Sequence, residues 1–301
     1  MFRYARGVLF LLFSFLSHQA SANPEIVTIA PLSPNDARYT YANELLNRIL
    51  EKTKKQHMDE KIVFYREAVS RQRAFRLLKE GKINIMAEAT QKHWEKELIP
   101  IRIPIRKGIQ GYRLFMVHKE HAQTVAQSQT LDDIRQFSTG AGFQWAIRRI
   151  LEQNDFEVIT SQQYDSLFKM LNAERFITFS RGVNEIFSEY QTQRDTNPNI
   201  IIDNSVALYT PLPTFYFVSP NNQALADRIQ TGLNMMIKTG EFDQFFYTNH
   251  RTMLERANLE QRKTFTLSNA NLSLETQDII TRRYYWHFPG DNLQGDTKAA
   301  P

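Results

Sequence analysis

The sequence predicts an α/β protein in which two units each hold a sheet covered by helices. Apolar side chains alternate between a strand-like period of two and a helix-like period of about 3.6, in the order β-α-β-α-β, between residues 25 and 87. A second alternating set begins near Thr130. The chain has 301 residues, 42% of them hydrophobic, which is enough for one large core or two modest ones.

The first unit begins with a strand at residues 25–30, where apolar and polar side chains alternate. The apolar residues between 41 and 50 fall on one helical face and predict a helix. The remaining elements follow in order: a strand at 62–65, a helix at 70–79 before Gly81, and a strand at 83–87.

The second unit follows a strand at residues 112–118. Thr130 and Asp133 form a capping pair that predicts a short helix, and Thr139 to Gly142 predict a tight turn that leads straight into a helix. The later elements are a strand at 157–160, a helix at 165–171, a strand at 176–179 and a helix at 183–190.

Beyond the second unit we expect the chain to return to the first. Residues 197–204 predict a polar loop, and Pro211 and Pro213 disfavour a central strand and favour a stiff connection. A long helix at 225–237 ends at Gly240. The expected division is a signal segment at 1–22, a discontinuous first lobe at 23–118 plus 209–290, a second lobe at 119–208 and a loose tail at 291–301.

The first 22 residues have the three parts of a secretory signal peptide. Arg3 and Arg6 precede an apolar run at 8–16, and a small-x-small sequence ends at Ala22. The run is shorter than the roughly 20 residues that span a membrane. An uncleaved anchor is the alternative. We expect cleavage, and a periplasmic or extracellular protein that is not embedded in the membrane.

Composition excludes several classes of function. The chain has no Cys, so it has no disulfide framework, thiolate metal site or cysteine nucleophile. Its net charge of +5 is mild, and nucleic-acid binders concentrate positive charge more strongly. No nucleophile–base arrangement emerges, and His118 and His121 lack a nearby acidic cluster. We therefore expect no nucleic-acid partner, no metal, no cofactor and no enzyme activity.

The order of elements and several strings resemble type II periplasmic solute-binding proteins of the amino-acid-binding family, family 3. The strings are Gly140 to Trp145, Tyr164 to Phe168, Arg175 to Gly182 and Phe215 to Pro220. The resemblance covers roughly residues 25–248 and implies two Rossmann-like lobes joined by a hinge, with a solute held between them.

Two departures separate this sequence from that family. The family has Thr-x-x-Arg after the third strand, where the Arg binds the carboxylate of an amino acid; here the string is Thr90 to His93 without an Arg. The family has an Asp for the ammonium group after a strand of the second lobe, where this chain has Ser180 and Arg181. A plain α-amino acid in the usual pose is therefore not expected.

Arg181 is the first candidate ligand residue. It ends a predicted strand, and ligands of parallel sheets lie at the carboxyl ends of strands. A guanidinium there can bind a carboxylate or phosphate with two parallel hydrogen bonds. The alternative is an ion pair with Glu185 or Glu189 of the next helix. If the ligand role holds, Arg181→Ala should weaken an anionic ligand more than tenfold and leave the fold intact.

The turn at Gly142 supplies the next candidates. Backbone N–H groups at a helix start favour an anionic oxygen. Gln144 and Trp145 lie just beyond it and would add a polar contact and an apolar wall. The alternative is a glycine that only makes the turn.

The rim of the first lobe supplies three further candidates. Arg38 and Tyr39 follow the first strand and can reach a ligand, or can be exposed residues of a first helical turn. Arg106 lies in a basic run and can replace the missing arginine, or can be part of a solvated rim.

The sequence therefore predicts a non-catalytic binding protein for a small, anionic solute. Lobe closure would present it to a membrane partner, either an ABC importer component or a sensor kinase. The alternatives are an interaction or signalling module that has kept the fold and lost the solute, and, less favoured, an enzyme on the same scaffold.

Overall fold

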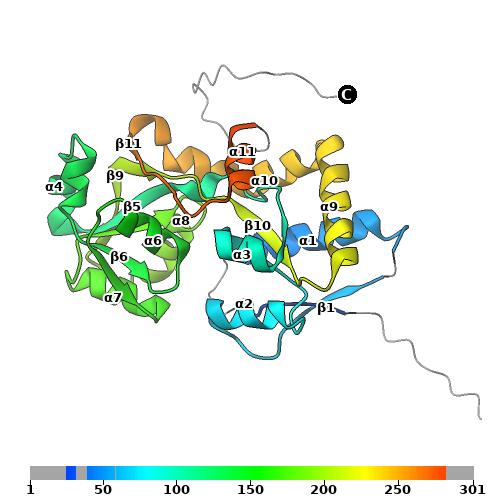
Figure 1. Cartoon of the computed structure of the whole chain (residues 1–301). Helices are drawn as coiled ribbons and strands as arrows, with labels where there is room; N and C mark the ends of the chain where they lie inside the picture. The colour runs from blue at the N-terminus through cyan, green and yellow to red at the C-terminus, as the bar shows by residue number, and fades with distance from the viewer. Residues whose placement is uncertain (1–24, 32–38, 58, 283–301) are drawn as a thin grey trace, which may run out of the picture.

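A computed structural model describes residues 25–31, 39–57 and 59–282. The predicted signal peptide, the tail at 291–301 and Arg38 lie outside these residues. Figure 1 shows two groups of elements side by side, which we call the first lobe (blue and cyan, with yellow α9) and the second lobe (mostly green).

Two small sheets build the first lobe. Strand β1 (Glu25–Thr28) pairs in parallel with β2 (Lys61–Phe64), and β10 (Thr214–Val218) lies between β3 (Ile85–Ala89) and β4 (Ile99–Ile101) with antiparallel register. Asn84 joins the two sheets, because its backbone N–H donates to the Val27 carbonyl at 2.8 Å. The parallel β1–β2 pair agrees with the β-α-β pattern, whereas β3 pairs antiparallel with β10, which arrives from far along the chain.

Helices cover both faces of these sheets. Helices α1 (Thr40–Thr53) and α9 (Gln223–Lys238) share one apolar cluster, centred on residues such as Leu45, Ile229 and Tyr216. Helices α2 (Arg71–Lys79) and α3 (Lys92–Glu97) pack on the other face with Phe215 and Phe217 of β10. The prediction of a stiff connection at 209–219 is therefore wrong for β10, a central strand that begins just after Pro213.

One six-stranded sheet builds the second lobe, in the order β11-β9-β5-β8-β6-β7. The strands are β5 (Tyr112–His118), β6 (Thr139–Gly142), β7 (Val158–Ser161), β8 (Thr178–Gly182), β9 (Ile200–Tyr209) and β11 (Lys263–Thr266). The covering helices are α4 (Ala122–Ala126), α5 (Leu131–Arg135), α6 (Ala146–Gln153), α7 (Tyr164–Asn172) and α8 (Ile186–Gln193). Strands β5 and β11 fall in stretches assigned by sequence to the first lobe, but both pair here with β9.

Two strands of this sheet differ from the sequence prediction. Residues 139–142 form strand β6 instead of a turn, because their small side chains fit between β7 and β8 and under the rings of Phe176 and Trp145. Residues 200–209 form a ten-residue strand, which begins inside the stretch 197–204 that was predicted to be a polar loop. The Asp203 carboxylate accepts from the N–H groups of Ser205 and Val206. These backbone donors lie where the pairing of β9 with β5 shifts register, and the carboxylate supplies their acceptor.

Two neighbouring segments connect the lobes at the hinge. The Thr210 N–H donates to the Gly111 carbonyl at 3.1 Å, and the rings of Tyr112 and Tyr209 lie 4.7 Å apart. A Cβ on Gly111 would lie 2.1 Å from the Thr210 carbonyl oxygen, so only glycine allows the two backbones to approach this closely.

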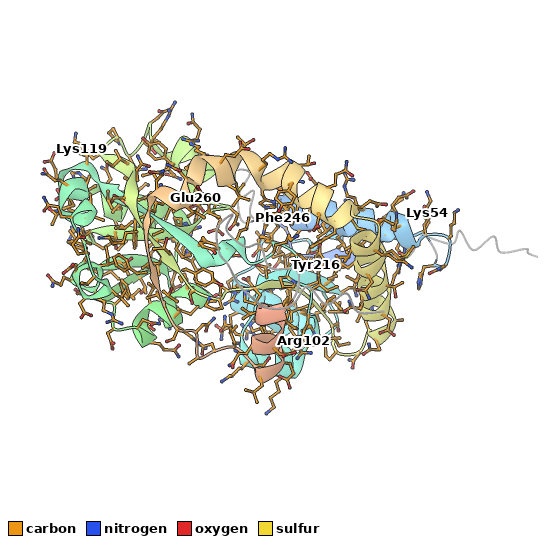
Figure 2. The ribbon with its side chains drawn as sticks, turned by 90° about the horizontal axis from the view of Figure 1, so that it is seen from above. Lys54, Arg102, Lys119, Tyr216, Phe246 and Glu260 are labelled. Atoms are coloured by element: carbon orange, nitrogen blue, oxygen red, sulfur yellow. The ribbon has the colours of Figure 1, made fainter. Side chains whose placement is uncertain are left out.

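Helix α10 (Glu241–Ala257) also reaches from one lobe to the other. Phe242 and Phe245 pack in the first-lobe core, whereas Phe246 and Ala257 pack in the second-lobe core. Figure 2 shows Phe246 between Lys54 and Lys119, which mark opposite ends of the molecule. Helix α11 (Leu274–Arg282) follows β11. Within the described ranges, no helix has both the length and the apolar character needed to cross a bilayer.

Candidate ligand-binding site

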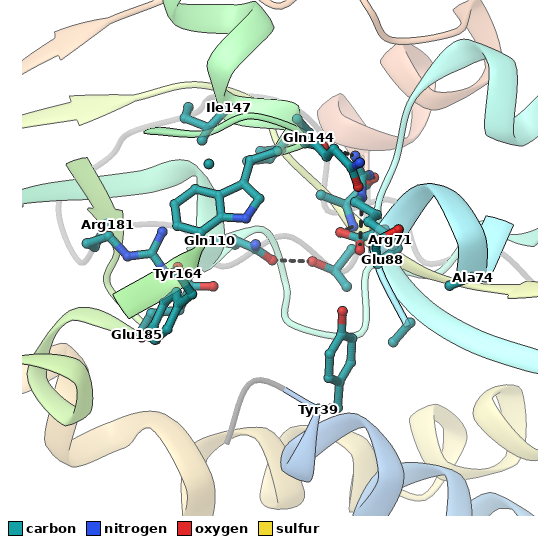
Figure 3. Close-up of a pocket in the computed structure, with 18 of the residues that line it drawn as sticks. Tyr39, Arg71, Ala74, Glu88, Gln110, Gln144, Ile147, Tyr164, Arg181 and Glu185 are labelled. Atoms are coloured by element: carbon teal, nitrogen blue, oxygen red, sulfur yellow. Dashed lines mark hydrogen bonds and ion pairs between the residues drawn. The ribbon is translucent and has the colours of Figure 1, made fainter. Parts of the chain in front are cut away.

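A cleft that encloses about 320 Å³ lies between the two lobes. Its volume is at the lower end of the range for small-molecule sites. Six of the seven predicted site residues line it: Tyr39, Arg106, Gly142, Gln144, Trp145 and Arg181. Figure 3 shows the hydroxyl of Tyr39 pointing into the cleft from one side, and Arg181 on the second-lobe side.

Arg181 lines the cleft and is held by two carboxylates. Its Nε donates to Glu189 Oε2 at 2.6 Å, and its Nη2 lies 3.0 Å from Glu185 Oε2. Burial opposes its charge, but Glu185 and Glu189 outweigh burial and keep the pKa of the guanidinium above its ordinary value. The ion-pair alternative is thus realised with both glutamates, and the charge of Arg181 is balanced within the protein.

Trp145 covers Arg181 from the side of the cleft. The Arg181 Cζ lies 4.4 Å from the centroid of the Trp145 ring, a cation–π distance. A Cβ on Gly142 would lie 2.3 Å from Trp145 Cε2, so the absence of a side chain at Gly142 makes room for the indole. Gly142 therefore shapes the wall of the cleft through Trp145.

The prediction that a helix starts directly after Gly142 is wrong. Helix α6 begins at Ala146, and two of the three intervening N–H groups already have backbone acceptors. The Phe143 N–H donates to the Ser161 carbonyl, and the Trp145 N–H donates to the Gly142 carbonyl. The chain adds one more parallel strand pairing before it turns into the helix, which moves the helix start away from Gly142.

Arg71 and Glu88 form the opposite end of the cleft, and neither was predicted from the sequence as a site residue. Arg71 Nε lies 3.0 Å from Glu88 Oε2, and Arg71 Nη1 donates across the cleft to the Gln144 carbonyl at 2.9 Å. Ser70 caps helix α2 and places Arg71 at its first turn, after the connection of residues 65–70 that follows β2. Its place after a strand is the one feature of the sequence that could have indicated Arg71, because ligands of α/β proteins lie at the carboxyl ends of strands.

Arg113 is buried in the cleft wall, with 2% of its surface exposed. Its Nη2 donates to the Ser180 carbonyl at 2.7 Å, and its Nη1 lies 4.0 Å from Glu185 Oε2. Its Nε has no hydrogen-bond acceptor among the described residues. Burial lowers the pKa of Arg113 to about 10, so it keeps its charge at neutral pH. Such a donor is costly to leave unmatched and suits a ligand oxygen.

Arg106 lies at the junction of α1, α10 and the cleft. Its Cζ is 4.7 Å from the centroid of the Tyr41 ring, and its Nη1 is 3.3 Å from His250 Nε2. His250 Nδ1 lies 2.9 Å from the Phe246 carbonyl and must donate to it, which leaves Nε2 to accept from Arg106. Burial, and then the charge of Arg106, lower the pKa of His250 to about 3. His250 is therefore neutral and positions Arg106.

At the first departure from the family pattern, Thr90 is bonded within the first lobe. The Thr90 hydroxyl donates to Glu95 at 2.6 Å, and Thr90 does not line the cleft. Asn184 lines the cleft instead, and its Oδ1 has no donor among the described residues. The wall of the cleft thus contains buried unmatched groups of both kinds, a cationic donor at Arg113 and a neutral acceptor at Asn184. In the described ranges no group of three or more His, Asp or Glu residues is placed to hold a metal ion.

Solved structures share this architecture. An ancestral arginine-binding protein bound to arginine has a TM-score of 0.55 and 14% identity over 75% of this chain and 97% of its own. An arginine-transport periplasmic binding protein from Legionella pneumophila has a TM-score of 0.55 and 15% identity over 76% of this chain and 100% of its own. The fold is that of a type II periplasmic binding protein.

A third solved structure widens the range of proteins that use the fold. It is an ancestral amino-acid-binding protein described as a precursor of cyclohexadienyl dehydratase, with a TM-score of 0.54 and 12% identity over 75% of this chain and 94% of its own. Neither a protein-family model nor a curated protein matches the sequence. Structural similarity at such low sequence identity establishes the fold alone. The ligand therefore has to be argued from the residues of the cleft.

Proposed function

We propose that this protein is an exported, non-catalytic binding protein that holds a small solute with an anionic oxygen in the cleft between its lobes. One observation carries the proposal. Arg113 is a buried cation on the cleft wall whose Nε–H has no acceptor among the described residues. A carboxylate oxygen of a ligand would satisfy it with a charge-assisted hydrogen bond.

The charges around the cleft favour an anionic group. The guanidinium groups of Arg71, Arg106, Arg113 and Arg181 and the carboxylates of Glu88 and Glu185 line it. Asn184 Oδ1 would accept from a hydroxyl or amino group of the same solute. The ligand class that fits both is a hydroxy- or amino-carboxylate, with Trp145, Tyr39 and Gln144 lining the space beside it.

Export and transport are supported by different observations. The signal-like sequence at residues 1–22 predicts delivery to the periplasm. Substrate-binding proteins of amino acid ABC transporters share the fold, which favours an ABC importer component over a sensor kinase as the membrane partner. Both partners remain compatible with a solute held in the cleft.

A ligand-free interaction module is the second candidate. Arg71 extends across the cleft to Gln144, and Arg181 is balanced by Glu185 and Glu189, so the protein supplies some of the contacts that a ligand would otherwise make. This module would bind a partner through its outer surface and would respond to no small molecule.

Thermal-shift screening against hydroxy- and amino-carboxylates separates the two candidates. A ligand that binds only the folded protein raises the melting temperature. For the compound with the largest shift, we expect Arg113→Lys to weaken binding at least tenfold in calorimetry, because lysine keeps the charge but has no Nε–H donor at that place. The exposed Lys169→Ala is the control and should bind normally. A panel without any shift would favour the interaction module.

A further inference from the structure

The segment at residues 262–276, which we call the strap, is fastened firmly to the second lobe. Strand β11 pairs in parallel with β9 from Lys263 to Thr266. The buried Arg262 donates to the carbonyls of Asp203 at 2.6 Å and Ala257 at 2.7 Å. Ser268 exchanges hydrogen bonds of 3.1 and 2.9 Å with the Asn154 side chain at the end of α6.

The same strap is fastened to the first lobe at a buried carboxylate. The Glu95 side chain, on α3, is 2% exposed. It accepts from the hydroxyls of Ser273 at 2.7 Å and Thr276 at 2.8 Å, both in the strap. Thr90 and Arg102 of the first lobe also donate to it. Hydrogen bonds to a buried, ionised carboxylate are stronger than those between neutral groups, so Glu95 binds these donors strongly.

Between these two ends the strap runs beside the hinge. The Leu267 N–H donates to the Tyr209 carbonyl at 2.7 Å, and the Asn269 amide donates to the Pro211 carbonyl at 2.8 Å. Figure 1 shows the chain passing from β11 on the second lobe to α11, which lies above α3 of the first lobe. The strap is therefore a further covalent crossing in addition to the two hinge segments and α10.

The lobes also touch directly at the cleft. Arg71 Nη1 donates to the Gln144 carbonyl, and the Gln72 N–H donates to Gln144 Oε1 at 3.2 Å. These bonds join the start of α2 to the loop before α6. Opening the lobes would have to break these two bonds as well as bonds of the strap.

We propose that the strap fixes the angle between the lobes, so that the cleft is closed before any ligand arrives. Hinge bending normally relies on a few residues that absorb the rotation, with little else between the two bodies. Here the rotation would have to break the bonds to Glu95 or to the hinge carbonyls. The cleft would then select its ligand by a preformed shape, and a partner would meet the same lobe arrangement with and without ligand.

Distance measurements between the lobes test this proposal without a ligand. The chain has no Cys, so Arg76→Cys on α2 and Lys169→Cys on α7 give two exposed sites for spin labels. In pulsed electron paramagnetic resonance we expect one narrow distance population. Adding Ser273→Ala and Thr276→Ala should produce a second, longer population, because Glu95 keeps Thr90 and Arg102 but loses both hydroxyls of the strap, which leaves the bond from the Lys92 N–H to the Asn271 carbonyl to hold the strap to α3.

The matched control removes two hydroxyls that donate to the carbonyl four residues earlier, one in α8 and one at the end of α9. Thr192→Ala and Thr239→Ala lose bonds to the carbonyls of Ser188 and Met235, and the narrow population should remain. A strap variant with the parent distribution, or a parent with a broad one, would overturn the proposal. If circular dichroism shows that the strap variant is unfolded, Asn269→Ala replaces it, with the same two outcomes. Because any co-purified molecule is first removed by unfolding and refolding, the result is independent of the proposed binding function.

Discussion

At the scale of single residues, the chemistry of the cleft depends on partners that the sequence cannot show. Arg181 was predicted from its place at a strand end, and the structure puts it in the cleft. Its two glutamate partners also lie where the following helix suggested. Arg71 and Arg113 were not predicted, because only the folded chain brings their guanidinium groups to the same cavity.

The ion pairs of Arg181 change the expected result of its substitution. Arg181→Met leaves Glu185 and Glu189 without their main cation inside the protein, which should cost about 3–5 kcal/mol of unfolding free energy. Equilibrium unfolding in urea measures this loss. Arg194→Met, at an exposed pair with Asp195, is the control and should change stability by less than about 1 kcal/mol. Equal losses in both variants would show that the ion pairs of Arg181 are not formed.

His250 should make the protein less stable in mild acid. Its pKa is about 3 in the folded protein and about 6.5 when unfolded, so the unfolded chain binds the extra proton first. The contribution of neutral His250 is complete above pH 6.5 and declines as the pH falls towards 3. By pH 5 the loss reaches about 2 kcal/mol.

The variant His250→Gln isolates this effect. Glutamine can donate to the Phe246 carbonyl and accept from Arg106, but it does not titrate. The stability advantage of the parent over the variant should therefore shrink between pH 7 and pH 5 in urea unfolding curves. An advantage that stays constant over this range would mean that His250 is already charged, or exposed, in the folded protein.

At the scale of elements, regular periodicity predicted most of the fold, and strands with unusual composition were missed. Strand β5 has the predicted bounds. All seven of its residues are buried, and most of them are apolar. Strand β10 was missed because Pro211 and Pro213 precede it, and β6 because small residues also suit turns. In both cases the deciding contacts come from distant parts of the chain.

The end of β6 offers a test of how the wall of the cleft is built. Gly142→Ala would place a methyl group on the Trp145 indole, and the melting temperature should fall by several degrees. Trp145→Phe removes part of that ring, so the double variant should lose less than the sum of the single losses. Additive losses in thermal unfolding would mean that the two residues do not contact each other.

At the scale of the whole molecule, the sequence predicted two lobes and a cleft but not the strap bonds that connect the lobes. The strap bonds join residues more than a hundred positions apart, such as Ser273 with Glu95 and Ser268 with Asn154. Local patterns carry no information about such pairs, so the return of β11 to the second lobe could not be anticipated. The proposed fixed angle between the lobes therefore rests on the structure and not on any sequence pattern.

Native mass spectrometry of the protein purified after export tests the central claim most directly. We predict one small, carboxylate-containing molecule bound per chain. The Arg113→Lys variant should carry much less of it, since its cleft lacks the buried Nε–H donor. Parent protein that is free of any bound molecule, and that also gains none from the carboxylate panel, would contradict a solute-binding cleft.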